Sequence, residues 1–502
     1  MSAKSLMIMG TASDVGKSVV VTALCRTFAR AGVRVAPFKS QNMSNNAAVC
    51  PGGDEIGRAQ AAQAEACGLE PTVDMNPVLL KPESETGCQV IIRGQARFHL
   101  RAHEHQRYRT AAWPEIIASY RALAERFELI IIEGAGGAAE VNLKERDLVN
   151  WAIAELANAP VLLVADIDKG GVFASLVGTT DLLSPRERQR VKGFLINKFR
   201  GDIRLLDSGL RFLEERTGIP VLGVLPYLRD LHIPQEDAAM LDTLSARAHE
   251  KSVTIGVVRV PRISNYTDFA PLEFEPDVAV QYVSDPESIS HLDVVCLPGS
   301  KSTVADLHWL RRAGWETFLT RHIRDGGWVV GVCGGYQMLG QYILDPQQIE
   351  SVAAETVGLG LLEVVTTFAR EKITAQVEGV TFGSGMPVSG YEIHAGRVIR
   401  QDAALSLFRL TKRNGHAINE LEGVQSPEGR IWGTSMHGVF DNAPRRRQFI
   451  DRIRASKGLG PLLTTTAPDA LARRIQEYDR FADVVEAHTD IARIFALVDD
   501  SR

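Results

Sequence analysis

The sequence predicts an α/β protein of two domains, each built on a mostly parallel sheet. Short apolar runs recur along the chain, and each is followed by a glycine-rich or polar turn and then by a helical stretch. Runs that are apolar throughout are typical of strands buried on both faces of a sheet. The chain also has 502 residues, which is more than the ~100–200 residues of a usual domain.

The first series of apolar runs predicts an N-terminal α/β domain over residues 1–235. The pattern then gives way to a polar and weakly helical stretch, and we interpret residues 236–252 as a linker. The strands expected in the N-terminal domain cover residues 5–10, 33–38, 128–133, 160–165, 191–197 and 220–225.

The second series predicts a C-terminal α/β domain over residues 253–450. Residues 451–502 follow as an amphipathic helical tail, which we expect to pack on this second domain. The strands expected in the C-terminal domain cover residues 254–260, 278–283, 293–297, 328–332 and 431–436.

The composition excludes several classes of protein. With a net charge of −5 the chain has no global basic field for nucleic acid or for an anionic membrane. Its six scattered cysteines include no Cys-x-x-Cys pair, which argues against a disulfide framework and the usual structural zinc site. Free thiols suit a reducing compartment. No run of ~18 apolar residues occurs, so we expect a cytoplasmic protein with no membrane span and no signal peptide.

A phosphate-binding loop follows the first expected strand and opens a helical stretch. It reads Gly10-Thr-Ala-Ser-Asp-Val-Gly16-Lys17-Ser18, with one residue more between the glycines than the usual loop has. Small residues such as Gly10, Thr11 and Gly16 let backbone N–H groups turn onto phosphate oxygens. Lys17 supplies positive charge to the phosphates, and Ser18 supplies a hydroxyl ligand for Mg²⁺. The loop therefore predicts ATP binding.

The variant loop resembles that of the dethiobiotin synthetase branch of P-loop enzymes. The resemblance implies a Mg²⁺-associated role for Glu133, a place near the γ-phosphate for Lys39, and contact with the nucleotide base for Asn197. The alternatives are a solvated acid at Glu133 and a surface lysine at Lys39. Asp166 and Asp168 follow another strand, at the edge where open α/β sheets bind ligands. We expect Asp166 to bind Mg²⁺, with substrate placement or a structural role as alternatives.

A candidate nucleophile elbow occurs in the second domain, where Gly331-Val-Cys333-Gly334-Gly335 joins an expected strand to a helix. The glycines permit a strained turn that pushes the Cys333 side chain out of the sheet. The helix N-terminus behind the turn favours the thiolate over the thiol. The backbone N–H of Gly334 is placed to bind an oxyanion.

A cysteine nucleophile requires a base. His437, at the end of the last expected strand, is our candidate, and His394 is its competitor. The Pro-Gly turn at Gly299 ends another strand and is expected to complete the oxyanion hole. Together these features resemble class I glutamine amidotransferases, which hydrolyse glutamine through a γ-glutamyl thioester and release ammonia. The resemblance implies that Gly299, Gly334 and Gln337 bind glutamine and its oxyanion.

The third member of a catalytic triad is not evident from the sequence. Familiar members of that class carry a Glu two residues after the His, and this chain has Val439 there. Asp441 or Glu392 is a candidate substitute; otherwise His437 works with Cys333 as a dyad.

The fusion of these two domains is similar to the cobyrinate-amidating family, and the shared motifs span nearly the whole chain. The resemblance implies that ATP, Mg²⁺ and L-glutamine are used to amidate a corrinoid polycarboxylate through an acyl phosphate. The b, d, e and g carboxylates of adenosylcobyrinic acid a,c-diamide would become the amides of adenosylcobyric acid. The residues alone indicate only a glutamine-dependent amidoligase. Besides the phosphate loop, the motifs are Gln41-Asn-Met-Ser-Asn-Asn46, Met75-Asn-Pro-Val-Leu-Leu-Lys-Pro82, Asp168-Lys-Gly-Gly-Val-Phe173, Pro298-Gly-Ser-Lys-Ser302 and Gly390-Tyr-Glu-Ile-His394.

Other interpretations are open. A sister enzyme amidates the a and c carboxylates, although the motifs at 41–46 and 75–82 argue against it. A P-loop ATPase of the chromosome-partitioning type would leave Cys333 without a purpose, and a corrinoid carrier would need an Asp-x-His-x-x-Gly motif that the chain lacks. His99, His103 and His105 suggest either a metal site on a helix or, as we prefer, part of a basic face toward substrate carboxylates.

Overall fold

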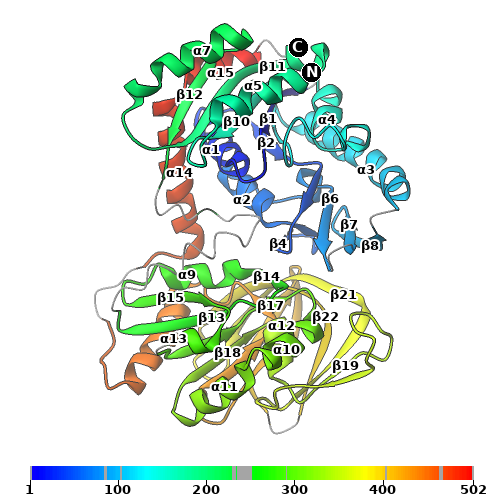
Figure 1. Ribbon diagram of the computed structural model, residues 1–502. Helices are drawn as coiled ribbons and strands as arrows, with labels where there is room; N and C mark the ends of the chain where they lie inside the picture. The colour runs from blue at the N-terminus through cyan, green and yellow to red at the C-terminus, as the bar shows by residue number, and fades with distance from the viewer. Residues whose placement is uncertain are drawn as a thin grey trace.

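The computed structural model describes residues 3–83, 87–101, 104–228, 233, 251–289, 291–401, 404–462 and 467–499. Two α/β domains lie one above the other, and a long C-terminal helix runs along the upper, N-terminal domain (Figure 1). Among these residues, no helix has both the length and the apolar content that a membrane span requires.

The N-terminal domain is built on a six-stranded parallel sheet, which confirms the six strands expected there. Along β1, Met7 and Met9 pack into one apolar cluster while Leu6 and Ile8 pack into another. The sheet is therefore buried on both faces, which explains why its strands are apolar throughout. In sheet order the strands are β12 (Val221–Pro226), β11 (Val191–Phe199), β10 (Val161–Asp166), β1 (Lys4–Gly10), β9 (Leu129–Glu133) and β2 (Val35–Phe38).

Helices cover both faces of this sheet. Leu24 of α1 and Ala62 of α2 pack on one face, whereas Ile116 of α3 and Leu176 of α5 pack on the other. The helices of this domain are α1 (Lys17–Arg30), α2 (Arg58–Ala66), α3 (His105–Arg126), α4 (Trp151–Leu156), α5 (Val172–Leu182), α6 (Pro185–Arg190) and α7 (Asp207–Thr217), with the 3₁₀ turns η1 (Val73–Met75), η2 (Lys144–Arg146) and η3 (Ile203–Leu206).

A smaller sheet and a hairpin lie between β2 and α3, where the sequence predicted no strands. The sheet has the order β3-β6-β7-β8. Because His99 lies in β8 and α3 begins only at His105, the helix suggested for the histidine cluster is wrong; His103 lies outside the described residues. The strands are β3 (Gln41–Met43), β6 (Val78–Pro82), β7 (Gly87–Ile92) and β8 (Gln95–Arg101), and the hairpin is β4 (Ala47–Val49) with β5 (Glu55–Gly57).

The C-terminal domain contains five neighbouring parallel strands, which confirm the five expected there. The last of them ends at Thr434, earlier than expected, and His437 lies in the separate short strand β26 (Met436–His437). In sheet order the five strands are β15 (Val278–Val283), β13 (Val253–Val258), β16 (Val294–Leu297), β18 (Trp328–Val332) and β25 (Ile431–Thr434).

Long antiparallel strands extend this sheet beyond β25, and the sequence analysis did not predict them. They are β21 (Val364–Thr381), β22 (Pro387–Arg400), β23 (Leu405–Arg413) and β24 (His416–Gln425), with the shorter β19 (Tyr342–Leu344) and β20 (Glu355–Val357) at the far edge. A two-stranded ribbon joins β14 (Ile263–Ser264) to β17 (Gly299–Ser300). The helices are η6 (Tyr266–Phe269), α9 (Ala270–Glu273), η7 (Pro286–Ser288), α10 (Thr303–Arg312), α11 (Trp315–Arg324), α12 (Gly334–Leu339) and α13 (Ala443–Ser456).

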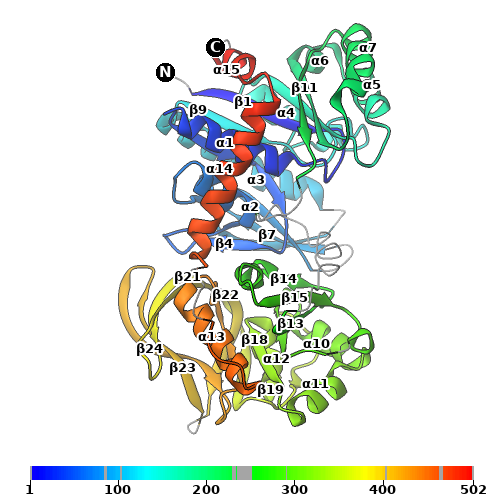
Figure 2. The ribbon, with the colours of Figure 1, turned by 90° about the vertical axis from the view of Figure 1, so that its left-hand side faces the viewer.

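The C-terminal helices correct one expectation. We expected the tail to pack on the second domain, but α14 (Ala470–His488) and α15 (Ile491–Asp499) pack on the first. Tyr478, Phe481 and Val485 are buried in the same apolar cluster as residues of α1. Figure 2 shows α14 running up from the C-terminal domain and along the N-terminal one. The apolar face of α14 is therefore buried against the N-terminal domain.

The two domains meet through the β4–β5 hairpin and the small sheet. Ala47, Val49, Leu79 and Ile91 of the N-terminal domain form an apolar cluster with Ile393 of the other.

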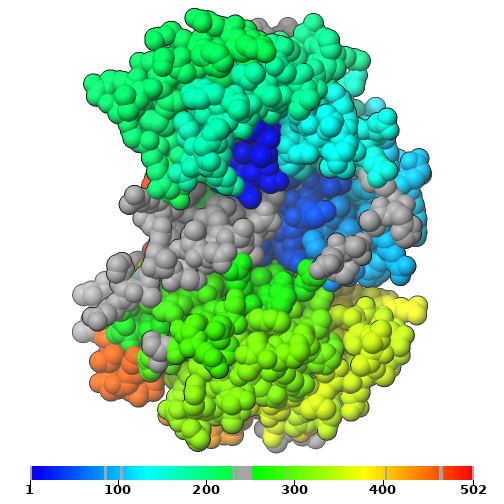
Figure 3. Space-filling view, in the orientation of Figure 1, coloured from blue at the N-terminus to red at the C-terminus, as the bar shows by residue number. Residues whose placement is uncertain are grey.

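On the outer surface of the N-terminal domain, residues from the start of the chain, coloured dark blue, are visible in a hollow between its cyan and green parts (Figure 3).

Candidate active sites

The phosphate loop connects β1 to α1 in a conformation that requires glycine. Gly16 has φ +96°, in the region that glycine tolerates best. A Cβ atom at Gly10 would lie 2.9 Å from both the Lys17 Nζ and the carbonyl oxygen of Ala12. The Lys17 ammonium donates to the carbonyl oxygens of Ala12 and Gly136, each at 2.9 Å. Lys17 is therefore held across the loop.

Glu133 is the centre of a buried cluster beside this loop. Its carboxylate accepts hydrogen bonds from Ser18 Oγ at 2.7 Å, Lys39 Nζ at 2.9 Å and Gln63 Nε2 at 2.5 Å. Burial alone would raise the pKa of Glu133, but the Lys39 charge and these hydrogen bonds lower it. The structure thus brings together three predicted residues. Gln63 was missed, because nothing in the sequence distinguishes it within its helix.

The oxygen donors of this cluster fit Mg²⁺. A serine hydroxyl and a carboxylate lie at one place, and proteins usually bind Mg²⁺ through one or two carboxylates together with substrate phosphates. In the part of the chain that the structure describes, no group of three or more His, Cys, Asp and Glu side chains could hold a metal ion by itself. Ser18 and Glu133 would hold the ion only with the help of nucleotide phosphates.

Asn197 and Asp166 lie on the neighbouring strands. Asn197 Nδ2 donates to the carbonyl oxygen of Val15 at 2.9 Å, so this side chain supports the phosphate loop. Asp166 forms an ion pair with Lys198 at 2.8 Å, and Asp168 pairs with Arg200 at 2.9 Å. Asp166 is therefore paired with Lys198, whereas Ser18 is bonded to Glu133.

Cys333 occupies the turn between β18 and α12 with a strained backbone. Its φ of 50° and ψ of −108° are uncommon for a residue with a side chain. A Cβ atom at Gly335 would lie 2.0 Å from the carbonyl oxygen of Leu297, so the turn needs glycine there. The Cys333 N–H donates to the carbonyl oxygen of Thr434 at 2.8 Å, and its own carbonyl accepts from the Gln337 N–H at 3.0 Å.

His437 is paired with an acid that the sequence analysis did not identify. Its Nδ1 lies 2.7 Å from Asp268 Oδ2, and the Gly438 N–H donates to the other oxygen at 2.9 Å. Both side chains of the pair are buried, and the Tyr391 ring stacks on the imidazole. Burial would lower the pKa of His437, but Asp268 and Cys333 outweigh burial and raise it to about 10. Asp268 lies 169 residues earlier in the chain, so no local motif links it to His437.

The other candidates for the base and the acid have different partners. His394 Nδ1 lies 2.6 Å from the carbonyl oxygen of Gly396, and its Nε2 lies 3.9 Å from Glu392. Glu392 pairs with Arg413 at 3.1 Å, and Asp441 lies 3.7 Å from Arg474. The carboxylate that contacts the His437 ring is instead that of Asp268.

The candidate oxyanion groups gather around the elbow. A Cβ atom at Gly299 would lie 3.3 Å from His437 Cε1, and one at Gly334 would lie 2.8 Å from the Ser300 backbone nitrogen. The backbone at Gly299, Ser300 and Gly334 therefore shares one place with the Cys333–His437 pair. Gln337 is buried, and its Oε1 accepts a long hydrogen bond of 3.4 Å from Thr303.

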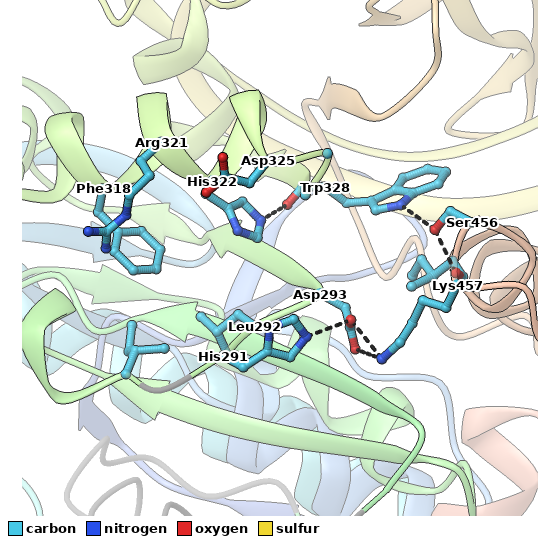
Figure 4. Close-up of a pocket in the computed structure, with 14 residues that line it drawn as sticks. His291, Leu292, Asp293, Phe318, Arg321, His322, Asp325, Trp328, Ser456 and Lys457 are labelled. Atoms are coloured by element: carbon cyan, nitrogen blue, oxygen red, sulfur yellow. Dashed lines mark hydrogen bonds and ion pairs between the residues drawn. The ribbon is translucent and has the colours of Figure 1, made fainter.

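A cavity of about 340 Å³ lies at the opposite edge of the same sheet, where β16 and β18 begin (Figure 4). His322 Nε2 lies 3.0 Å from the Trp328 carbonyl oxygen, and Asp293 contacts both His291 at 3.1 Å and Lys457 at 2.8 Å. Ligands bind at the carboxyl ends of strands in sheets of this kind, and this cavity lies at the amino ends. We assign it no ligand.

The fold and the two sites define a class of protein: a P-loop nucleotide-binding domain fused to a glutamine amidotransferase domain. Two family matches agree with this class. Residues 6–238 match the family described as the CobQ/CobB/MinD/ParA nucleotide binding domain. Residues 254–445 match the family described as the CobB/CobQ-like glutamine amidotransferase domain.

Relatives that align over the whole chain identify the family. The chain is 47% identical to a cobyric acid synthase of Dehalococcoides mccartyi (strain CBDB1), over 99% of each chain. It is 48% identical to one from Sorangium cellulosum (strain So ce56), again over 99% of each. Identity to one from Salmonella heidelberg (strain SL476) is 44%, over 99% of this chain and 98% of that one. The chain belongs to the cobyric acid synthase family, which confirms the predicted cobyrinate-amidating resemblance.

Proposed function

We propose that this protein uses ATP and glutamine to amidate the b, d, e and g carboxylates of adenosylcobyrinic acid a,c-diamide, giving adenosylcobyric acid in cobalamin biosynthesis. The observation that carries the proposal is that one chain holds both half-sites, the Cys333 elbow and the phosphate loop with its buried Glu133. Full-length similarity to cobyric acid synthases supports the corrinoid substrate. The reliance on ATP and on a free thiol supports a cytoplasmic location.

In the glutaminase half-reaction, the Cys333 thiolate attacks the side-chain amide carbon of glutamine. His437 gives its proton to the leaving nitrogen, so that ammonia departs and a γ-glutamyl thioester remains. Water then attacks the thioester with His437 as base, which releases glutamate and restores the thiolate. The raised pKa of His437 supports its role as the proton donor to the leaving nitrogen, and Asp268 orients the ring through Nδ1.

We assign binding of the oxyanion that forms in this reaction to the backbone around the elbow. We assign the Gly334 N–H and the turn at Gly299 to the negative oxygen that develops on the glutamine amide. Their position beside His437 and Ser300 supports this assignment. We also assign Gln337 to the glutamine pocket. Its backbone N–H donates to the Cys333 carbonyl oxygen, so Gln337 lies next to the elbow.

In the synthetase half-reaction, a substrate carboxylate attacks the γ-phosphorus of ATP and forms an acyl phosphate and ADP. Ammonia then displaces phosphate from the acyl carbon and leaves the amide. We assign Lys17 and Lys39 to the phosphate charge, the backbone of Gly10, Thr11 and Gly16 to the phosphate oxygens, and Asn197 to the base side of the loop. Mg²⁺ held by Ser18 and Glu133 would supply further neutralisation of the phosphates. We assign Asp166, at the end of β10, as a further candidate ligand.

The experiment that tests this function supplies the purified full-length protein with ATP, Mg²⁺ and glutamine, together with one corrinoid acid at a time. ADP release and the mass of the corrinoid product are measured. We expect the a,c-diamide to gain amides at its four remaining peripheral carboxylates, b, d, e and g. Amidation of cobyrinic acid at a and c instead would assign the sister activity, and ATP turnover without an amide product would overturn the proposal.

A further inference from the structure

Asn265 is a buried contact between the two active domains. It lies between β14, which pairs with the candidate oxyanion strand, and η6, which carries Asp268. Its Oδ1 accepts a hydrogen bond of 2.8 Å from the Ala47 N–H, which belongs to β4 of the N-terminal domain. Its Nδ2 lies 3.3 Å from His437 Nε2. One amide thus touches both the glutaminase base and the synthetase domain.

The contact with Ala47 decides which way the amide faces. A backbone N–H can only donate, so it selects the oxygen of Asn265 and leaves the NH₂ group toward His437. An NH₂ group can also only donate, so it matches His437 when Nε2 is unprotonated and the ring proton is on Nδ1, against Asp268. This is the form in which His437 serves as a base.

The other groups around the imidazole favour its protonated form. Asp268 of η6 accepts from Nδ1, Cys333 of the elbow faces the ring as a potential thiolate, and Tyr391 of β22 stacks on it. Asn265 differs from these three neighbours, because its NH₂ group opposes a proton on Nε2. If the amide turned over, its oxygen would accept from Nε2–H and hold the proton that ammonia release requires.

We propose that Asn265 is a positioning residue through which docking of the β4 strand sets His437 for proton transfer to the departing ammonia and for hydrolysis of the thioester. Glutamine hydrolysis is thereby coupled to the packing of the synthetase domain. The inference rests on the proposed glutaminase role of Cys333 and His437. It does not depend on which corrinoid is amidated.

Two substitutions separate the two contacts of Asn265 in the full-length protein. Both Gly and Asp tolerate its left-handed backbone, φ 50° and ψ 38°. Asn265→Gly removes both contacts, whereas Asn265→Asp keeps the acceptor for Ala47 and loses the donor to His437. We expect each to lower kcat for glutamine hydrolysis about 10- to 100-fold, with KM for glutamine changed less than about threefold.

Gln376→Ala is the matched control. Gln376 Nε2 donates to the carbonyl oxygen of Val49 at 2.9 Å, so this variant loses a neighbouring interdomain bond without touching His437. We expect its glutaminase kcat to stay within about twofold of the wild type. Wild-type kcat in Asn265→Gly, recovery in Asn265→Asp, or an equal loss in Gln376→Ala would each overturn the inference. Failure of the proposed function would show differently, as a wild-type protein that amidates no corrinoid from either glutamine or ammonium salts.

Discussion

At the scale of single residues, Cys333 combines a strained backbone with the chemistry assigned to it. Its positive φ costs about 1–3 kcal/mol. The surrounding structure sustains this conformation through the backbone bonds to Thr434 and Gln337 and through the close fit of Gly335 against Leu297. The turn places the sulfur within 3.6 Å of the Ile393 carbonyl oxygen, on the strand that also carries Tyr391.

The assignment of Cys333 and His437 predicts a separation of the two nitrogen sources. Cys333→Ser should abolish glutamine-dependent amidation, because an alcohol is a much weaker nucleophile than a thiolate at neutral pH. The same variant should still amidate when ammonium salts replace glutamine, since the acyl phosphate forms in the other domain. Amide formation with each nitrogen source is the measurement. His437→Ala should show the same separation, though less completely.

His394→Ala is the comparison for this prediction. His394 contacts the Gly396 carbonyl oxygen and lies near Glu392, so the variant should keep most of its glutamine use. Selective loss of glutamine use in His394→Ala, with His437→Ala unaffected, would mean that the base is misassigned. Glutamine use by Cys333→Ser at the wild-type rate would remove the amidotransferase chemistry altogether.

Lys17→Ala should produce the opposite separation. The ammonium group is held across the phosphate loop, where it meets the charge that develops during phosphoryl transfer. Amidation should fall about 10²- to 10³-fold with either nitrogen source, while glutamine hydrolysis persists. Steady-state rates of ADP and glutamate release measure the two halves. Lys192→Ala, an exposed lysine on β11, should leave both rates unchanged; near-normal ATP-dependent amidation by Lys17→Ala would exclude the assigned role.

Asp268→Asn tests the acid of the triad through its effect on pH dependence. In the wild type, Asp268 and Cys333 raise the pKa of His437 to about 10, so the imidazolium persists well above neutral pH. Without the carboxylate, burial lowers that pKa, and the alkaline loss of glutaminase activity should move to a lower pH. We expect kcat at pH 8 to fall about 10²- to 10⁴-fold. Glu392→Gln should not move this alkaline limb, and an unmoved limb in Asp268→Asn would contradict the pair.

The residues of the two sites differ in how far the sequence predicts them. Lys17, Ser18 and Cys333 lie in contiguous motifs whose spacing fixes a turn, so their chemistry can be predicted from the chain alone. Asp268 and Asn265 come to His437 from a segment about 170 residues away. Only tertiary packing makes them neighbours, and a short polar segment around η6 carries no periodic signal.

At the scale of elements, burial decides which strands the sequence predicts. Strands such as β9, in which every residue is buried, read as continuous apolar runs. The long strands β21 and β24 carry many exposed polar residues between their buried ones. Their pairing gives them their structure, since the antiparallel partners β22 and β23 supply the hydrogen bonds and the covered face. Such strands can be assigned only when the partner is known.

The helix α14 shows that an amphipathic pattern predicts a buried face but not the domain against which that face packs. Its apolar pattern predicts a helix with one buried face, but the pattern does not say which domain buries it. The structure places that face on α1 and β12, and Arg26 forms a bidentate pair with Asp479 along the same contact. Arg474 further joins Glu65 of the first domain to Asp441 of the second. These ion pairs join α14 to α1 and α2, which lie more than 400 residues earlier in the chain.

At the scale of the whole molecule, contacts across a partly buried interface link the two domains that carry the half-sites. Lys301, next to the candidate oxyanion turn, pairs with Glu83 of the first domain at 2.9 Å. Glu55 of β5 accepts from Lys81 at 2.6 Å and from Lys372 of the second domain at 2.5 Å. Glu55 therefore joins β5 of the first domain to β21 of the second across the interface.

Glu55→Gln is expected to weaken the joint between the domains. Burial would raise the pKa of Glu55, but Lys372 and Lys81 lower it to about 2, so the group is ionised and paired at neutral pH. Removing its charge leaves two lysines with no carboxylate in a buried place, which costs about 3–5 kcal/mol. We expect a lower midpoint of urea unfolding and a smaller ratio of glutamine-dependent to ammonium-dependent amidation.

The pH dependence of that loss has a definite sign. Because the folded pKa of Glu55 lies below its ordinary value of 4.5, its contribution to stability is complete above pH 4.5 and disappears as pH falls through about 2. The difference in unfolding midpoint between the wild type and Glu55→Gln should therefore be largest near neutral pH and shrink over that acidic window. Glu378→Gln is the matched control, since its pair with Lys412 is half-exposed at 2.9 Å and is worth at most about 1 kcal/mol. An equal loss of stability in both variants, or a Glu55→Gln difference that stays constant down to pH 2, would show that the buried charge does not hold the domains together.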